Sequence, residues 1–192
     1  MTLLILGLVL FLGVHSVRVF AESWRGGVRA RLGEGAYKGL YTLASVAGLV
    51  LIVWGYGLAR QQPVLLWLPP VWTRHLAALL TVPAFILLAA AYVPRNSIKA
   101  KVHHPMVLAV KVWALAHLLA NGTLADVLLF GGFLVWAVLN FRAARQRDRA
   151  AQLSVPAGRL GPTLVAVGVG LVAWAAFAFW AHSVLIGVRP FG

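Results

Sequence analysis

The chain has 192 residues, of which 61% are hydrophobic and 11% charged, and its mean hydropathy is +0.88. Soluble domains carry about 25% charged residues, and a soluble chain of this size could not bury so much apolar surface. These numbers exclude an ordinary soluble domain and predict an integral membrane protein with the lipid bilayer as its first partner. Cysteine is absent, which excludes disulfides, iron–sulfur clusters and haem held through cysteine sulfur.

Six apolar segments approach the length of about 20 residues that a helix needs to cross a bilayer. They are Thr2–Ala21, Gly39–Ala59, Thr73–Val93, Pro105–Ala120, Ala125–Phe141 and Gly161–Ile186. The first segment has no basic residue ahead of its apolar core, so we expect a retained span and not a cleaved signal peptide. The pattern predicts an all-α, polytopic integral membrane helical bundle with about six transmembrane helices.

Basic residues predict the orientation of these spans. Three loops on one side carry twelve of them: Arg25, Arg29, Arg31 and Lys38 after the first span, Arg95, Lys99 and Lys101 after the third, and Arg142, Arg145, Arg147, Arg149 and Arg159 after the fifth. The opposite side carries three, which are Arg60, Arg74 and Arg189. Cytoplasmic loops are the basic ones, so we expect a multi-pass protein with both termini outside. The same rule accounts for the net charge of +13, and we expect no nucleic-acid partner.

Two histidines lie where ionisable side chains are costly and therefore suggest function. His15 is about 13 residues into the first span, and His117 is 13 residues beyond His104. At about 1.5 Å per residue, each lies about 20 Å into the bilayer from its own side. Trp113, His117 and Asn121 are spaced i, i+4 and i+8, which places them on one helix face.

Two intramembrane histidines on different helices can hold a b-type haem, because each offers a neutral imidazole nitrogen to the iron. We therefore interpret His15 and His117 as metal ligands in a cofactor site for haem b. Trp113 and Asn121 share the face of His117 and are assigned to the same site. Zinc is disfavoured, because it prefers four ligands with cysteine or carboxylate among them.

The other four histidines have different placements. His75 and His182 lie near the outer ends of their spans and stay open as alternative ligands. His103 and His104 lie at the predicted cytoplasmic interface, where a solvated histidine is ordinary.

Four segments resemble the NnrU family over nearly the whole chain: His15-Ser16, Gly33–Tyr41, His104–Met106 and Trp113–Gly122. The most specific is Trp-Ala-x-Ala-His-x-x-x-Asn-Gly, which begins at Trp113. The resemblance implies a single NnrU-like transmembrane domain over residues 1–192, located in a bacterial inner membrane. It also implies a link to denitrification and nitric oxide metabolism, with respiratory or denitrification membrane proteins as partners.

The NnrU family is similar to the plant and cyanobacterial 15-cis-zeta-carotene isomerase, a membrane protein that uses haem b. The two ligand histidines of that relative match His15 and His117 by motif. The resemblance therefore implies haem b as the cofactor, with haem-dependent isomerisation or nitric oxide sensing as the activity. It implies a hydrophobic small molecule or nitric oxide as the ligand.

Two other functions stay open. One is a non-enzymatic assembly or regulatory partner of a respiratory enzyme, since the short outer loops leave little surface for catalysis. The other is an S-adenosylmethionine-dependent membrane methyltransferase, with its cofactor near His104 and Asn140. The chain departs from that pattern, because the expected Arg-His-Pro reads His103-His104-Pro105 and a common glycine is Ala109. These departures disfavour the methyltransferase.

The charge distribution generates a topology prediction. A reporter enzyme that works only outside the cytoplasm should be active when fused after Gly192 and inactive when fused after Arg149. The reason is the excess of basic residues in the loops that the positive-inside rule assigns to the cytoplasm. The opposite pattern of activities would reverse the orientation.

Overall fold

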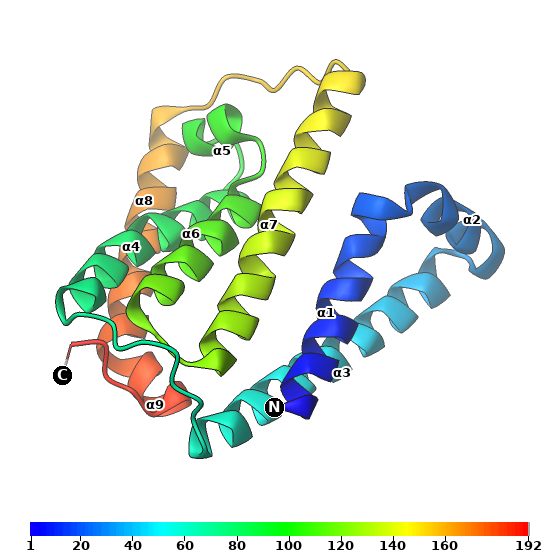
Figure 1. Ribbon diagram of the computed structural model, residues 1–192. Coiled ribbons are helices and arrows are strands. Elements are labelled where there is room, and N and C mark those ends of the chain that lie inside the picture. The colour runs from blue at the N-terminus through cyan, green and yellow to red at the C-terminus, as the bar shows by residue number, and fades with distance from the viewer. Residues whose placement is uncertain (192) are drawn as a thin grey trace. The chain divides into compact units, whose positions relative to one another are not determined.

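The computed structural model describes residues 1–191, which are largely helical and contain no β-strand. The helices are α1 (Thr2–Phe20), α2 (Glu22–Leu32), α3 (Glu34–Gln61), α4 (Trp72–Tyr92), α5 (Ser97–Val102), α6 (Pro105–Ala120), α7 (Leu124–Ala150), α8 (Leu160–Ala176) and α9 (His182–Ile186) (Figure 1). A single π-helical turn, η1 (Phe177–Ala181), joins α8 to α9. The predicted all-α fold class is confirmed.

Five helical stretches are long and apolar enough to cross a membrane: α1, α3, α4, α7 and the continuous Leu160–Ile186. The remaining predicted span forms α6, with the predicted bounds and 16 residues. Most boundaries lie within two residues of the prediction, but α3 begins earlier, at Glu34. The polar run Arg142–Ala151 is expected to extend the fifth helix, and α7 does continue to Ala150. Alanine, arginine and glutamine are good helix formers, so the polar run after Phe141 extends the helix beyond its apolar part.

The surface of these helices is apolar. Four apolar side chains on different helices are each more than two-thirds exposed: Val9 (68%), Leu43 (69%), Leu79 (67%) and Val172 (70%). A soluble protein rarely exposes contiguous apolar surface of this kind. Lipid contact removes the penalty, so the fold is that of a membrane protein.

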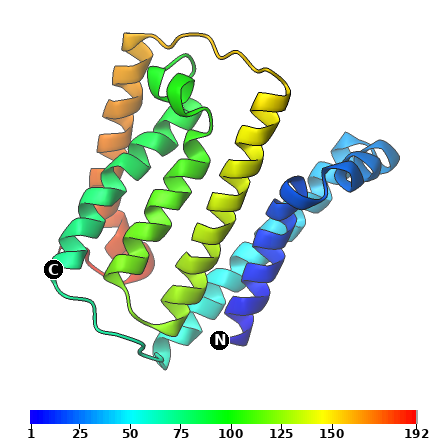
Figure 2. The same cartoon turned by 45° about the horizontal axis from the view of Figure 1, so that its top comes forward.

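The chain divides into two compact units, each described by itself. Unit 1 comprises Met1–Trp67 and Gly122–Asn140, and unit 2 comprises Leu68–Asn121 and Phe141–Gly192. In unit 1, α1 packs along α3 (blue to cyan in Figures 1 and 2). The short helix α2 connects them along the chain and contacts both. In unit 2, α4 packs against α6 and α8, and the short α5 contacts all three (green and orange in Figures 1 and 2).

Glycines bring α1 and α3 into backbone contact. A Cβ atom added at Gly48 of α3 would lie 2.8 Å from the backbone nitrogen of Phe11. One added at Gly7 would lie 2.6 Å from the nitrogen of Ile52, and one at Gly55 would collide with the backbone of Leu4. Close approach through small residues is how membrane helices gain packing energy, so these glycines set the spacing of the pair.

A buried carboxylate connects α3 to the start of α7 within unit 1. Asp126 is 5% exposed, and its Oδ1 accepts a 2.6 Å hydrogen bond from the Tyr56 hydroxyl. Its Oδ2 accepts from the backbone nitrogen and the hydroxyl of Thr123, at 3.0 and 2.6 Å. The Asp126 nitrogen donates back to the Thr123 hydroxyl at 3.3 Å, which completes a reciprocal cap of α7.

In unit 2 the connection between α4 and α6 is built around Asn96, which is 1% exposed. Its Nδ2 donates to the carbonyls of Ala90 and Val93 at 2.9 and 2.6 Å. Its Oδ1 accepts from the backbone nitrogen of Lys99 at 2.7 Å and thereby caps α5. All the hydrogen-bonding groups of this buried amide are used, so α5 is held firmly against the end of α4.

The glycine contacts generate a stability prediction. Gly48→Ala should lower the free energy of unfolding by about 1–3 kcal/mol, because the added methyl group overpacks the backbone of Phe11. Gly57→Ala, in the same helix, meets no atom within 4 Å and should be neutral or stabilising by up to about 1 kcal/mol. Unfolding by denaturant in detergent micelles measures both. Equal effects of the two substitutions would contradict the close-packing argument.

Candidate functional site

His15 lies in α1 among aromatic side chains of unit 1. Its ring stacks on Phe11 with centroids 4.2 Å apart, and the rings of Tyr41 and Trp136 lie at 5.2 and 6.1 Å. The Nδ1 atom is 2.7 Å from the Phe11 carbonyl oxygen. A carbonyl can only accept, so Nδ1 carries the proton and Nε2 carries the lone pair.

His117 has the same local arrangement in α6 of unit 2. Its Nδ1 donates to the carbonyl of Trp113 at 2.8 Å, and the two rings lie 5.2 Å apart. Asn121 ends the helix, because its backbone nitrogen and its Nδ2 both donate to the His117 carbonyl, at 3.0 and 2.8 Å. The structure therefore brings together the three residues that the i, i+4, i+8 spacing places on one face.

His15 and His117 thus share a pattern but belong to different units. In each, the residue four positions earlier is aromatic, its carbonyl accepts from Nδ1, and its ring packs against the imidazole. The alternative ligands differ from this pattern. His182 donates from Nδ1 to the carbonyl of Val188 beyond its own helix, at 2.7 Å, and His75 is exposed.

A second group of polar side chains lies in unit 2, where α5 meets α6. His104 Nε2 is 2.9 Å from Asp148 Oδ2, and His103 Nδ1 is 3.3 Å from the same oxygen. Arg145 contributes its guanidinium at 3.6 Å. We call these four residues the dihistidine cluster.

The dihistidine cluster was not expected from the sequence. The sequence interpretation places His103 and His104 as ordinary solvated residues, whereas their side chains are 21% and 28% exposed and share one carboxylate. The Asp148 side chain is 14% exposed. One signal could have found it, because Asp148 is the only acidic residue after Asp126 and stands within an arginine-rich run.

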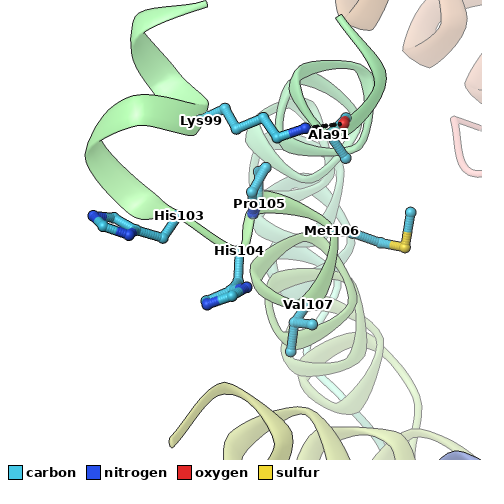
Figure 3. Close-up of a pocket in the computed structure, with 7 residues that line it drawn as sticks. All are labelled: Ala91, Lys99, His103, His104, Pro105, Met106 and Val107. Carbon is cyan, nitrogen blue, oxygen red and sulfur yellow. Dashed lines mark hydrogen bonds between the residues drawn. The ribbon is translucent and has the colours of Figure 1, made fainter. Parts of the chain in front are cut away.

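Beside the dihistidine cluster lies a cavity of about 210 Å³ (Figure 3). It is lined by Ala91, Lys99, His103, His104, Pro105, Met106 and Val107. The Lys99 side chain extends along one side of the cavity, and its ammonium donates to the Ala91 carbonyl at 3.0 Å (Figure 3). His103 adopts φ +64°, a left-handed conformation that is uncommon for residues other than glycine.

Among residues 1–191, no group of three or more histidine, aspartate or glutamate side chains is arranged to hold a metal ion. A haem iron has four porphyrin nitrogens and takes only one or two ligands from the protein. Single histidines with a defined tautomer, as at His15 and His117, fit that requirement.

The fold and these sites define a polytopic helical membrane protein that carries histidines within its apolar helices. The model of one protein family, described as NnrU protein, matches residues 3–190. The chain therefore belongs to the NnrU family, as the sequence resemblance indicates. No curated protein and no solved structure matches the chain.

The dihistidine cluster generates a prediction on stability. His104→Gln and Asp148→Asn should each destabilise the protein, and their effects should couple by about 1 kcal/mol, because each removes the same partly buried, charge-assisted hydrogen bond. A double-mutant cycle on unfolding in detergent measures the coupling. Additive effects would show that the contact contributes nothing to stability.

Proposed function

We propose that this NnrU family protein is a membrane-embedded haem b protein in which His15 and His117 would hold the iron through Nε2. The observation that carries the proposal is their common hydrogen bond from Nδ1 to the carbonyl four residues earlier. Histidines that bind metal through one ring nitrogen commonly donate the other to a backbone carbonyl or carboxylate. The ligand that such a protein would handle is nitric oxide or a hydrophobic small molecule.

The carbonyls of Phe11 and Trp113 have a direct chemical role in this proposal. By holding the proton on Nδ1, they keep the lone pair on Nε2 and make the imidazole a stronger ligand. The aromatic rings next to each imidazole restrict its rotation, so the nitrogen keeps one direction. These features would suit each histidine to hold the iron of a haem through Nε2.

The aromatic surroundings of His15 have a second effect. Phe11, Tyr41 and Trp136 place three aromatic rings around the half-buried imidazole, and apolar surroundings are one of the features that tune a bound haem. Bound haem b supplies a redox-active iron that can bind nitric oxide. The link to denitrification and to haem-dependent isomerisation belongs to this proposal and rests on the family resemblance.

An optical spectrum tests the proposal. Protein purified from haem-replete cells should show a Soret band that shifts on reduction and on addition of nitric oxide. His15→Ala and His117→Ala should each remove the haem or convert it to a five-coordinate form, while the amount of inserted protein stays the same. If these histidines only pack, their loss should lower stability by about 0.6–2 kcal/mol and leave the spectrum unchanged.

The controls are His103→Ala and His104→Ala, which lie outside the apolar part of the helices and should keep the wild-type spectrum. Wild-type protein without haem would overturn the proposal and favour the non-enzymatic partner of a respiratory enzyme. Haem that survives both His15→Ala and His117→Ala would reassign the ligand. His182 would then be the next candidate, because it also donates from Nδ1 to a carbonyl.

A further inference from the structure

The cavity beside the dihistidine cluster is lined by basic side chains, and it lies apart from His15 and His117. Three of its side chains, Lys99, His103 and His104, are basic (Figure 3). They come from α5 and from the two residues that join α5 to α6. The positive-inside rule accounts for basic residues in this loop, but it does not require three of them to line one cavity.

The charges of the cavity favour an anion. The lysine ammonium is bonded to the neutral carbonyl of Ala91, so that bond does not compensate its charge. Asp148 is the carboxylate within reach of the two imidazoles, and it is already shared with Arg145. The single negative charge of Asp148 therefore faces the positive charges of Lys99 and Arg145 and two imidazoles that can each take up a proton. A divalent cation would be repelled by Lys99, whereas an anion would be attracted by it.

The cavity is also held in a fixed shape. Asn96 uses its whole amide to fix the start of α5, and the backbone nitrogen of Ser97 donates to the Thr163 hydroxyl at 2.8 Å. At the other end of α5, His103 is kept in the left-handed region. Strained backbone of this kind persists only where the surroundings hold it, and it is found preferentially at ligand sites. Hydrogen bonds therefore hold the backbone that carries Lys99 and the two histidines.

We propose that this cavity binds the phosphate group of a phosphate monoester. Lys99 would supply a point charge to the phosphate, which lysine commonly does. His104 would donate from Nδ1 in its protonated form while its Nε2 stays on Asp148, so Asp148 acts as a positioning residue. The volume of about 210 Å³ exceeds what a phosphate group needs and leaves space for the first atoms of the ester. The phosphate belongs either to a soluble monoester or to a lipid headgroup.

Binding measurements on the full chain in phosphatidylcholine nanodiscs test this site. The titrations use inorganic phosphate and the monoester glycerol 3-phosphate at pH 6, near the second pKa of a phosphate monoester. A parallel set of nanodiscs contains phosphatidic acid. Lys99→Gln and His104→Gln should each weaken binding at least about tenfold, because a charge-assisted hydrogen bond is lost.

Two variants control for charge and for folding. Lys101→Gln removes an exposed lysine of the same helix that does not line the cavity, and it should bind like wild type. Lys99→Arg keeps the charge and should restore most of the affinity lost in Lys99→Gln. If Lys99→Gln fails to fold, His104→Gln and Lys99→Arg still give the comparison.

The outcomes separate cleanly. Saturable binding of the soluble phosphates supports the site with a soluble monoester as ligand, and binding confined to phosphatidic acid supports it with a lipid headgroup. No binding to either probe overturns the proposal. An equal loss in Lys101→Gln also overturns it, because general surface charge would then explain the binding.

Discussion

The backbone contact between α1 and α3 is the constraint on which unit 1 depends. In lipid the apolar surface of a helix gains little by meeting another helix, so association relies on close packing. Gly7, Gly48 and Gly55 permit that packing. Gly48 faces Phe11, and Phe11 in turn provides both the carbonyl and the ring that hold His15. The direction of an imidazole in one helix therefore follows from a missing side chain in the other.

In unit 2, hydrogen bonds from a buried polar side chain hold the helix ends together. Asn96 is buried and hydrogen-bonded through both its amide nitrogen and its amide oxygen, and it caps the short helix α5. Glycine again brings helices together further along, since Gly170 of α8 meets the backbone of Ile86 in α4. Asn96 hydrogen-bonds backbone groups directly, and Gly170 allows close helix packing that covers them. Both matter where little water is present to hydrogen-bond the backbone.

Much of the fold could be predicted, because the length and hydropathy of a segment identify it as a membrane-spanning helix. The bounds of α6 follow from Pro105, which suits the first turn of a helix, and from Asn121, which caps its end. The end of α7 does not follow from hydropathy, because the helix continues through polar residues. The composition of Arg142–Ala151 predicts this extension instead, since its residues favour helix without being apolar. Local spacing also placed Trp113, His117 and Asn121 on one face.

Contacts between distant parts of the sequence escaped prediction. Asp148 is 44 residues from His104, and Tyr56 is 70 residues from Asp126. No periodicity connects such pairs, since they depend on how helices pack. The roles of Gly48 and Gly170 were equally hidden, because glycine is frequent in membrane helices and only the partner backbone shows which ones are required.

The two units are interleaved along the chain, and this has a consequence for biogenesis. Unit 1 needs residues Gly122–Asn140, yet Leu68–Asn121 of unit 2 are made before them. At about 5–20 residues per second, the ribosome reaches the start of α7 roughly 3–13 s after α3 is complete. During that interval the α1–α3 pair must persist in the membrane without its third helix, and its glycine contacts are the means by which it can. No single cut in the chain would release either unit whole.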